Sequence, residues 1–124
     1  MGKDLIGYFY LALTIIFTVY GQLILKWRIG LKGAMPAENL EKLLYFKNAF
    51  LDIWVISGFA SAFIASIAWM ATLTKFDLSY AYPFMSLSFV IVFFLSVLFF
   101  QEAITWQKLV GLGFVIGGLI IISK

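Results

Sequence analysis

The sequence lacks cysteine and histidine altogether, and charged residues make up only 12% of it. Without thiols the chain cannot form disulfides or use a cysteine nucleophile, and without imidazole it lacks the usual acid–base catalyst at neutral pH. Zinc and similar metal sites are excluded for the same reason, since they are built from these residue types. No Ser-His-Asp triad and no pair of catalytic carboxylates is visible either. The sequence therefore predicts a protein that is not an enzyme and that holds no metal and no cofactor.

Apolar residues make up 64% of the 124 residues, which is more than a soluble domain of this size could bury. A helix needs about 20 apolar residues to cross a hydrocarbon core of roughly 30 Å. Four segments are long enough, namely residues 5–25, 53–73, 80–100 and 106–122. The first has no small-residue cleavage site, which favours a retained span over a signal peptide. The predicted fold is all-α, a single domain over residues 1–124 that forms an integral membrane bundle of four transmembrane helices.

The connection between the first two spans, residues 27–52, is the only long one. Pro36 suits the first turn of a helix, and apolar residues recur after it at helical spacing. Residues 36–50 are expected to form a short amphipathic helix in the membrane interface, or else an extension of the second span. The other connections, residues 75–79 and 101–105, are so short that the helices they join must be antiparallel neighbours.

Basic residues concentrate in and beside the long connection: Lys26, Arg28, Lys32, Lys42 and Lys47. At a membrane surface such clustering reflects topology or contact with anionic lipid, so nucleic acid is not an expected partner. With Lys108 on the same side, the positive-inside rule places both termini outside the cytoplasm. The bias is small enough that insertion in either or both orientations stays open.

The polar residues within the spans are neutral, because all six acidic residues fall at span ends or in loops. A proton-coupled exporter of organic cations usually needs a carboxylate at mid-membrane depth. The first span carries instead a polar stripe of residues four apart: Thr14, Thr18, Gln22 and Lys26. The stripe either lines a cavity, or its threonines bond to their own helix while Gln22 holds helices together.

Three further polar or aromatic residues complete the candidate substrate site. Trp69, near the end of the second span, is either a cavity wall or an interfacial residue. Tyr82 and Ser86 lie one turn apart in the third span around Pro83. This proline is tolerated in a first helical turn, or it breaks the hydrogen-bond ladder where a cavity can use the freed carbonyl. The predicted substrate-binding residues are therefore Thr14, Thr18, Gln22, Lys26, Trp69, Tyr82 and Ser86.

The second and fourth spans carry small residues that allow a close approach of helices. In the second span Gly58, Ala62 and Ser66 recur four apart. The fourth span has almost no polar group, and Gly113 and Gly117 form a GxxxG pattern within it. This helix is predicted to pack against another helix, from a second chain, through its glycines: Gly111, Gly113, Gly117 and Gly118.

Three motifs follow one another along the chain. Residues 18–26 read Thr-Val-Tyr-Gly-Gln-Leu-Ile-Leu-Lys, residues 81–90 read Ala-Tyr-Pro-Phe-Met-Ser-Leu-Ser-Phe-Val, and residues 111–118 read Gly-Leu-Gly-Phe-Val-Ile-Gly-Gly, with Glu102 after the third span. Together they resemble the drug/metabolite transporter superfamily in its four-helix form, which includes small multidrug resistance proteins and EamA-like flippase subunits for undecaprenyl-phosphate-linked aminoarabinose. The drug exporters have a glutamate where this chain has Thr18, so the flippase subunits are the closer match.

The resemblance implies an antiparallel dimer in the cytoplasmic (inner) membrane, in which the first three helices of each subunit line a chamber and the fourth helices hold the subunits together. It leaves open whether the partner is a second copy or a similar small subunit. The implied function is alternating-access flipping of a polyprenyl-phosphate-linked sugar. Hydroxyls and amides such as those of Thr18, Gln22, Tyr82 and Ser86 suit a sugar, and Lys26 suits a phosphate. The alternatives are a small multidrug-type exporter and a non-transporting subunit of a glycosyltransferase system.

Overall fold

The computed structural model describes the backbone of residues 2–124 and the side chains from Leu5 onward. All regular structure in this part of the chain is helical. The helices are α1 (Gly2–Lys32), α2 (Asn39–Leu51), α3 (Ile53–Leu73), α4 (Leu78–Phe84), α5 (Ser86–Phe100) and α6 (Trp106–Ser123). Four helical segments are long and apolar enough to cross a membrane, with α4 and α5 together forming the third. The predicted all-α fold with four such helices is confirmed.

Helix α1 continues well beyond the predicted span of residues 5–25. Its 31 residues are about 46 Å long at 1.5 Å per residue, against a hydrocarbon core of roughly 30 Å. Segment 26–32 stays helical although it includes Gly30, and the helix ends only before Gly33, which has a φ of 82°. Hydropathy therefore marks where the apolar part of α1 ends, whereas the helix itself continues through its last cations to Lys32.

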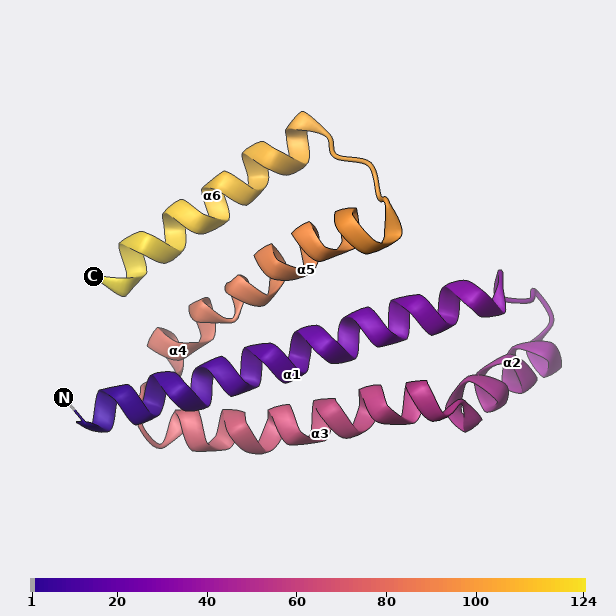
Figure 1. Cartoon of the computed structure of the whole chain (residues 1–124), viewed down its shortest axis with the longest axis horizontal. Coiled ribbons are helices and arrows are strands. Elements are labelled where there is room, and N and C mark those ends of the chain that lie inside the picture. The colour runs from indigo at the N-terminus through magenta and orange to yellow at the C-terminus, as the bar shows by residue number, and fades with distance from the viewer. Residues whose placement is uncertain (1) are drawn as a thin grey trace.

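Helices α1 and α3 lie side by side and antiparallel along their length (Figure 1). At their crossing, a Cβ added to Gly21 would lie only 3.2 Å from the carbonyl oxygen of Gly58, so both backbones approach as closely as the small residues predicted. The Ser61 hydroxyl reinforces this contact by donating a hydrogen bond of 2.6 Å to the carbonyl of Phe17. The closely packed helices α1 and α3 therefore form one side of any cavity next to them.

The third span begins earlier than predicted and is broken. Helix α4 starts at Leu78, so Pro83 is the sixth helical residue and not part of the first turn. Because proline has no N–H, it cannot donate to the carbonyl of Ser79, and the helix ends at Phe84 before restarting at Ser86. Of the two interpretations of Pro83, the structure shows the interrupted ladder, and the change of direction between α4 and α5 is visible in Figure 1.

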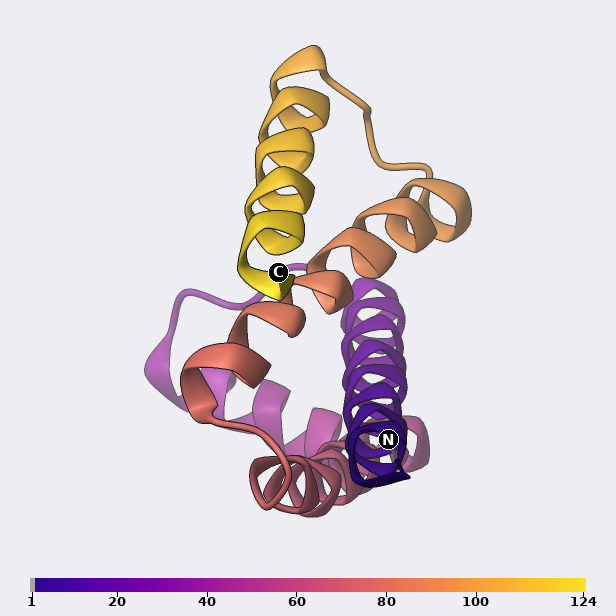
Figure 2. The ribbon, with the colours of Figure 1, turned by 90° about the vertical axis from the view of Figure 1, so that its left-hand side faces the viewer.

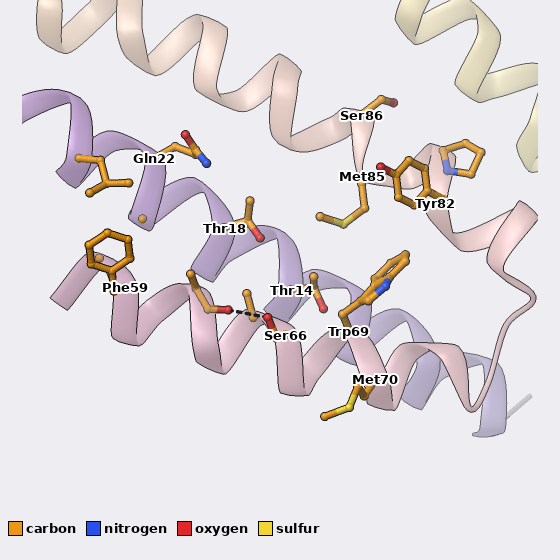
Figure 3. A pocket seen from close by; sticks show the side chains of 16 residues that line it. Thr14, Thr18, Gln22, Phe59, Ser66, Trp69, Met70, Tyr82, Met85 and Ser86 are labelled. Carbon is orange, nitrogen blue, oxygen red and sulfur yellow. Dashed lines mark hydrogen bonds between the residues drawn. The ribbon is translucent and has the colours of Figure 1, made fainter. Parts of the chain in front are cut away.

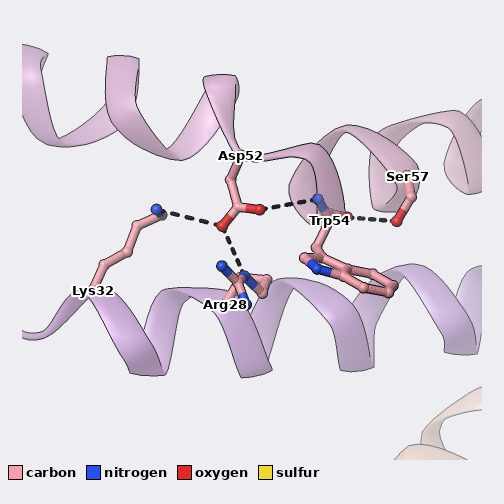
Figure 4. Close-up of polar contacts among 5 residues, drawn as sticks. All are labelled: Arg28, Lys32, Asp52, Trp54 and Ser57. Atoms are coloured by element: carbon pink, nitrogen blue, oxygen red, sulfur yellow. Dashed lines mark hydrogen bonds and ion pairs between the residues drawn. The ribbon is translucent and has the colours of Figure 1, made fainter.

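Asp52 joins the end of α1 to the junction of α2 and α3 (Figure 4). One carboxylate oxygen accepts a hydrogen bond of 2.9 Å from the backbone N–H of Trp54 and so caps α3. The other accepts a hydrogen bond of 2.7 Å from Arg28 Nε and lies 3.4 Å from Lys32 Nζ. The hydrogen bond from Arg28 is the main reason why the pKa of the Asp52 carboxyl is below its ordinary value of 3.8.

Helix α2 begins at Asn39, three residues after the predicted start at Pro36. Figures 1 and 2 show that it turns away from α3 at Asp52 instead of continuing that helix. Its apolar side chains, such as Leu40, Leu43 and Phe50, are exposed. The structure thus forms a separate helix here with an uncovered apolar surface, and the place of this helix in the membrane interface stays a prediction.

Helix α6 lies on the far side of α4 and α5 from the α1–α3 pair (Figures 1 and 2). Leu112 and Leu119, seven residues apart, are the buried residues of this helix, so one stripe faces the rest of the chain. A Cβ added to any of its four glycines would meet no atom within 4 Å. The glycine surface of α6 is therefore open within the single chain, and its predicted contact with a second chain stays a prediction.

Candidate functional site

A cavity of about 800 Å³ lies between α1, α3 and the break in the third span. Six of the seven predicted substrate-binding residues line it, all except Lys26. They come from four helices, α1, α3, α4 and α5, because the stripe on α1 faces the small residues of α3 on one side and the α4–α5 break on the other. Figure 3 shows these side chains around the same space. The structure brings together the residues Thr14, Thr18, Gln22, Trp69, Tyr82 and Ser86.

The hydroxyl groups in the cavity wall differ in whether they already have a partner. Thr14 is 2% exposed, and its hydroxyl donates a hydrogen bond of 2.9 Å to the carbonyl of Tyr10 in the same helix. Ser66 donates in the same way to the carbonyl of Ala62 at 3.0 Å. No hydrogen bond among the described residues involves the side chains of Thr18, Gln22 or Ser86. These three side chains, and the Tyr82 hydroxyl, which likewise has no hydrogen bond among the described residues, can bind a polar ligand without first breaking a bond.

Trp69 belongs to the cavity wall. Its ring is half-buried against the cluster of Leu11, Ile15 and Val19 and rises from α3 toward Tyr82 (Figure 3). The two ring centroids are 6.1 Å apart and the ring planes are inclined by 74°. An edge-to-face pair of this kind leaves parts of both ring faces accessible. Trp69 and Tyr82 therefore form an aromatic corner at one end of the cavity.

Lys26 lies at the other end, one helical turn beyond Gln22 and outside the lining. Its side chain is 61% exposed, and its Nζ lies 3.8 Å from the carboxylate of Glu102 in the α5–α6 loop. Sequence reasoning placed Lys26 at the end of the stripe but did not foresee this partner, which tertiary structure brings from far along the chain. An exposed pair at this distance is weak.

Four aromatic rings pack together near the start of α1, outside the residues that line the cavity, and sequence reasoning missed them. The Tyr8 and Tyr80 hydroxyls are hydrogen-bonded at 2.6 Å, joining α1 to α4. Phe76 packs against Tyr8 and Tyr80 with centroid distances of 4.9 and 5.3 Å, and Phe84 lies 5.1 Å from Tyr80. The signal that could have revealed them is the spacing of Phe76, Tyr80 and Phe84, which recur four residues apart.

The cavity wall carries no charged side chain. Asp52 is engaged by Arg28 and Lys32 beyond the membrane span, and Glu102 is at the mouth beside Lys26. Among the described residues no group of acidic side chains could hold a metal ion. The arrangement can form hydrogen bonds and aromatic contacts with a polar group, and it places a cation at one mouth.

Comparison with known proteins gives several relatives along almost the whole chain. A Proteus mirabilis protein is 31% identical over 125 residues, which cover 95% of this chain and 92% of that protein. A Photorhabdus laumondii protein is 32% identical over 126 residues, covering 95% and 97%. Both are named probable 4-amino-4-deoxy-L-arabinose-phosphoundecaprenol flippase subunit ArnF, whereas an Aeromonas hydrophila protein, 29% identical over 91% of this chain and 93% of its own length, is named subunit ArnE.

No protein-family model and no solved structure matches the chain. Two of the relatives are nevertheless more than 30% identical to this chain over 95% of its length. The chain is a multi-pass membrane protein of the drug/metabolite-transporter type, and it belongs to the family of 4-amino-4-deoxy-L-arabinose-phosphoundecaprenol flippase subunits.

Proposed function

We propose that the chain is one subunit of a flippase that moves a polyprenyl-phosphate-linked sugar across the inner membrane. The observation that carries this proposal is an uncharged, hydrogen-bonding cavity between the apolar helices, with Lys26 one helical turn beyond its lining. A lipid-linked sugar has the complementary parts, since its sugar forms hydrogen bonds, its phosphate is an anion and its tail is apolar. The head group passes through the cavity while the tail stays in the bilayer.

The free polar groups of the cavity suit a sugar. The Thr18 and Ser86 hydroxyls donate and accept, and the Gln22 amide offers both kinds of group at once, so together they can match hydroxyls of varied orientation. Tyr82, which is 65% exposed, adds a ring and a hydroxyl from the opposite wall. A polar group that leaves water is stabilised only if such partners replace the water.

Lys26 binds the phosphate at the mouth in this proposal. The phosphate displaces the Glu102 carboxylate, which holds Lys26 only loosely at 3.8 Å. A charge-assisted contact between an ammonium and a phosphate is stronger than a neutral hydrogen bond, so the exchange favours the lipid. From Lys26 to Thr14 the stripe extends about 18 Å along the helix axis, so the head group moves along α1 in more than one step.

Transport in this proposal requires a second subunit, by alternating access between the two. The third and fourth spans bury only 6% and 11% of their apolar windows inside the chain, so a single subunit leaves one side of the cavity region thinly covered. The relatives carry two different subunit names, ArnE and ArnF, which supports pairing with a similar but different chain. A dimer of two identical chains is the alternative, and copurification of the chain with or without a different subunit distinguishes the two.

Reconstitution tests this function. The chain, alone and coexpressed with a candidate partner subunit, is placed in liposomes that contain a short-chain polyprenyl-phosphate sugar with a fluorophore, and movement is followed as protection from an impermeant quencher. We expect movement faster than in empty liposomes, and slower movement when Thr18 and Gln22 are both replaced by alanine. No movement under any pairing would refute the proposal. Efflux of small organic cations instead would identify a drug exporter.

A further inference from the structure

The lining of the cavity limits which of its side chains could bind an amino group on the transported sugar. The relatives are named for a 4-amino sugar linked through phosphate, so a head group of this kind carries an ammonium and a phosphodiester. Their charges cancel, and a net-neutral head group suits a cavity without charged side chains. A buried ammonium still needs a partner, yet no carboxylate lines this cavity. The inference that follows rests on the proposed function and concerns where that ammonium binds.

Aromatic ring faces are the remaining groups that attract a cation. Three rings line the cavity, from Phe59, Trp69 and Tyr82. Phe59 is stacked on Phe50 with a centroid distance of 5.5 Å and an angle of 28°, so that ring is partly covered by its neighbour. Trp69 and Tyr82 meet at 74° and leave a corner between their faces. Tryptophan is also the strongest cation–π partner among the side chains.

We propose that the corner between Trp69 and Tyr82 is the subsite for a positively charged amino substituent on the transported sugar. The ammonium lies against the ring faces, while Thr18 and Gln22 bind hydroxyl groups farther along the same cavity. Met85, which lines the cavity beside the two rings, shields the corner with an apolar side chain (Figure 3). Tryptophan is the strongest cation–π partner, and Trp69 is the one tryptophan in the lining, so this corner is the place in the cavity where such contacts are most effective.

The subsite makes a prediction about specificity. Acylation of the sugar amine removes its charge, so the head group becomes a net anion and loses its contact with the rings. A desolvated cation–π contact corresponds to a preference of roughly tenfold or more for the free amine over its acylated form. The discrimination should depend on the two rings and not on the hydroxyl and amide groups of α1.

The test uses the full chain with its partner subunit in nanodiscs and two probes, a short-chain polyprenyl-phosphate 4-amino sugar and its N-formyl derivative. Binding of each is measured for the wild type, Trp69→Leu, Trp69→Phe and Gln22→Ala. We expect the wild type to prefer the free amine about tenfold or more. Trp69→Leu should reduce that preference by weakening only the free amine, and Trp69→Phe should reduce it less. Gln22→Ala, the matched control, should weaken both probes alike.

Two results would separate the failure of the subsite from the failure of the function. If the wild type binds both probes equally, or if Trp69→Leu weakens both to the same extent, the ammonium does not bind at this corner although the flippase function stands. If the wild type binds neither probe, the proposed function fails and the subsite with it. Tyr82→Leu is the second variant should Trp69→Leu not fold, because the Tyr82 side chain is 65% exposed and its loss removes little packing.

Discussion

Within the cavity, the partners that each side chain already has determine what it can bind. Thr14 and Thr18 are one turn apart on the same face of α1, yet the Thr14 hydroxyl is buried and bonded to the carbonyl of Tyr10. Thr18 is half-exposed toward the cavity and has no such bond among the described residues. A ligand that uses Thr18 gains a hydrogen bond without losing one, whereas at Thr14 the helix itself competes.

Replacement of Thr18 tests its place in the site. Thr18→Glu should abolish transport of the lipid head group, because an anion at mid-membrane depth repels phosphate and is itself costly to desolvate. Thr18→Val keeps the shape but loses one hydrogen bond, so transport should fall about fivefold. The measurement is the quencher-protection rate in liposomes. Ser66→Ala is the control, since the Ser66 hydroxyl is bonded to Ala62 within α3. Unchanged rates in both Thr18 variants would remove this residue from the site.

Replacement of Lys26 tests whether its positive charge binds the phosphate of the lipid head group. Lys26→Gln should weaken binding of the lipid head group about tenfold or more, because it removes a charge-assisted contact with phosphate, and Lys26→Arg should retain part of the affinity. Expression and dimerisation should persist, since the side chain is 61% exposed. Binding is measured in nanodiscs. Lys47→Gln, which removes an exposed cation from α2, should bind like the wild type. If Lys26→Gln also does, the phosphate is held elsewhere, and Arg28 is the next residue to replace.

The sequence was sufficient to predict six residues that line the cavity, but it wrongly added Lys26 to them, missed Phe59 and Met85, and did not predict the hydrogen-bonding state of each side chain. Four-residue spacing put Thr18 and Gln22 on one face of α1, and the Ala-Tyr-Pro motif pointed to Tyr82. Spacing could not distinguish Thr14 from Thr18, since both threonines can bond to their own helix. Nor could it pair Lys26 with Glu102, because the ends of α1 and α5 meet only through the packing of the whole bundle.

Among the elements, the junction at Asp52 holds three helices in one place. Its carboxylate caps α3 and accepts from Arg28 on α1, while α2 ends at the residue before it. The Trp27 and Trp54 rings pack beside this contact with centroids 5.5 Å apart. The carboxylate must be ionised to hold both cations, so the junction should loosen when it is protonated.

The pH dependence of stability tests this junction. Because the folded pKa of Asp52 lies below its ordinary value of 3.8, its contribution is complete above that value and is lost as the pH falls below it toward the folded pKa. Asp52→Asn should therefore lower the Tm in detergent at about pH 7, and its deficit should shrink as the pH approaches about 3. Arg28→Gln removes the main hydrogen-bond donor to Asp52, so it should also lower the Tm, and this deficit should also shrink as the pH falls. Parallel Tm curves for wild type and Asp52→Asn across this range would contradict the assignment.

Hydropathy predicted the apolar middle parts of the helices well and the residues at which the helices begin and end poorly. Each apolar segment is helical because its backbone groups have no other partner in the bilayer. The end of α1 lies seven residues beyond the predicted limit at Leu25, because Lys26, Arg28, Leu31 and Lys32 are good helix formers that outweigh Gly30, and the helix ends before Gly33. The start of α4 at Leu78 was missed because Pro83 suggested a first turn, although the sequence before it continues as a helix.

For the whole molecule, the uncovered surface of α6 is the feature that a single chain leaves unexplained. A groove of about 480 Å³ runs along this helix, lined by Val110, Gly113, Phe114, Gly117, Gly118 and Ile121. Gly111 lies outside the lining, although the sequence suggested that it shares the contact. The glycines in the groove leave room for another backbone to approach, because a Cβ added to any of them would meet no atom within 4 Å. A helix of the partner subunit is the occupant that the prediction of a dimer assigns to this groove.

Filling the groove tests the dimer. In Gly117→Leu the side chain would occupy the space that a second helix needs, so we expect a shift toward monomer while insertion and helix content stay unchanged. Gly111→Leu is the matched variant, with the same substitution on the same helix but outside the groove lining, and it should shift the equilibrium less. Crosslinking in liposomes, with the chain alone and with its partner subunit, measures the dimer fraction, and transport should fall in parallel because one subunit cannot enclose the head group. Equal dimer fractions in the wild type and both variants would place the subunit contact on a different helix, with the exposed face of α5 to be substituted next.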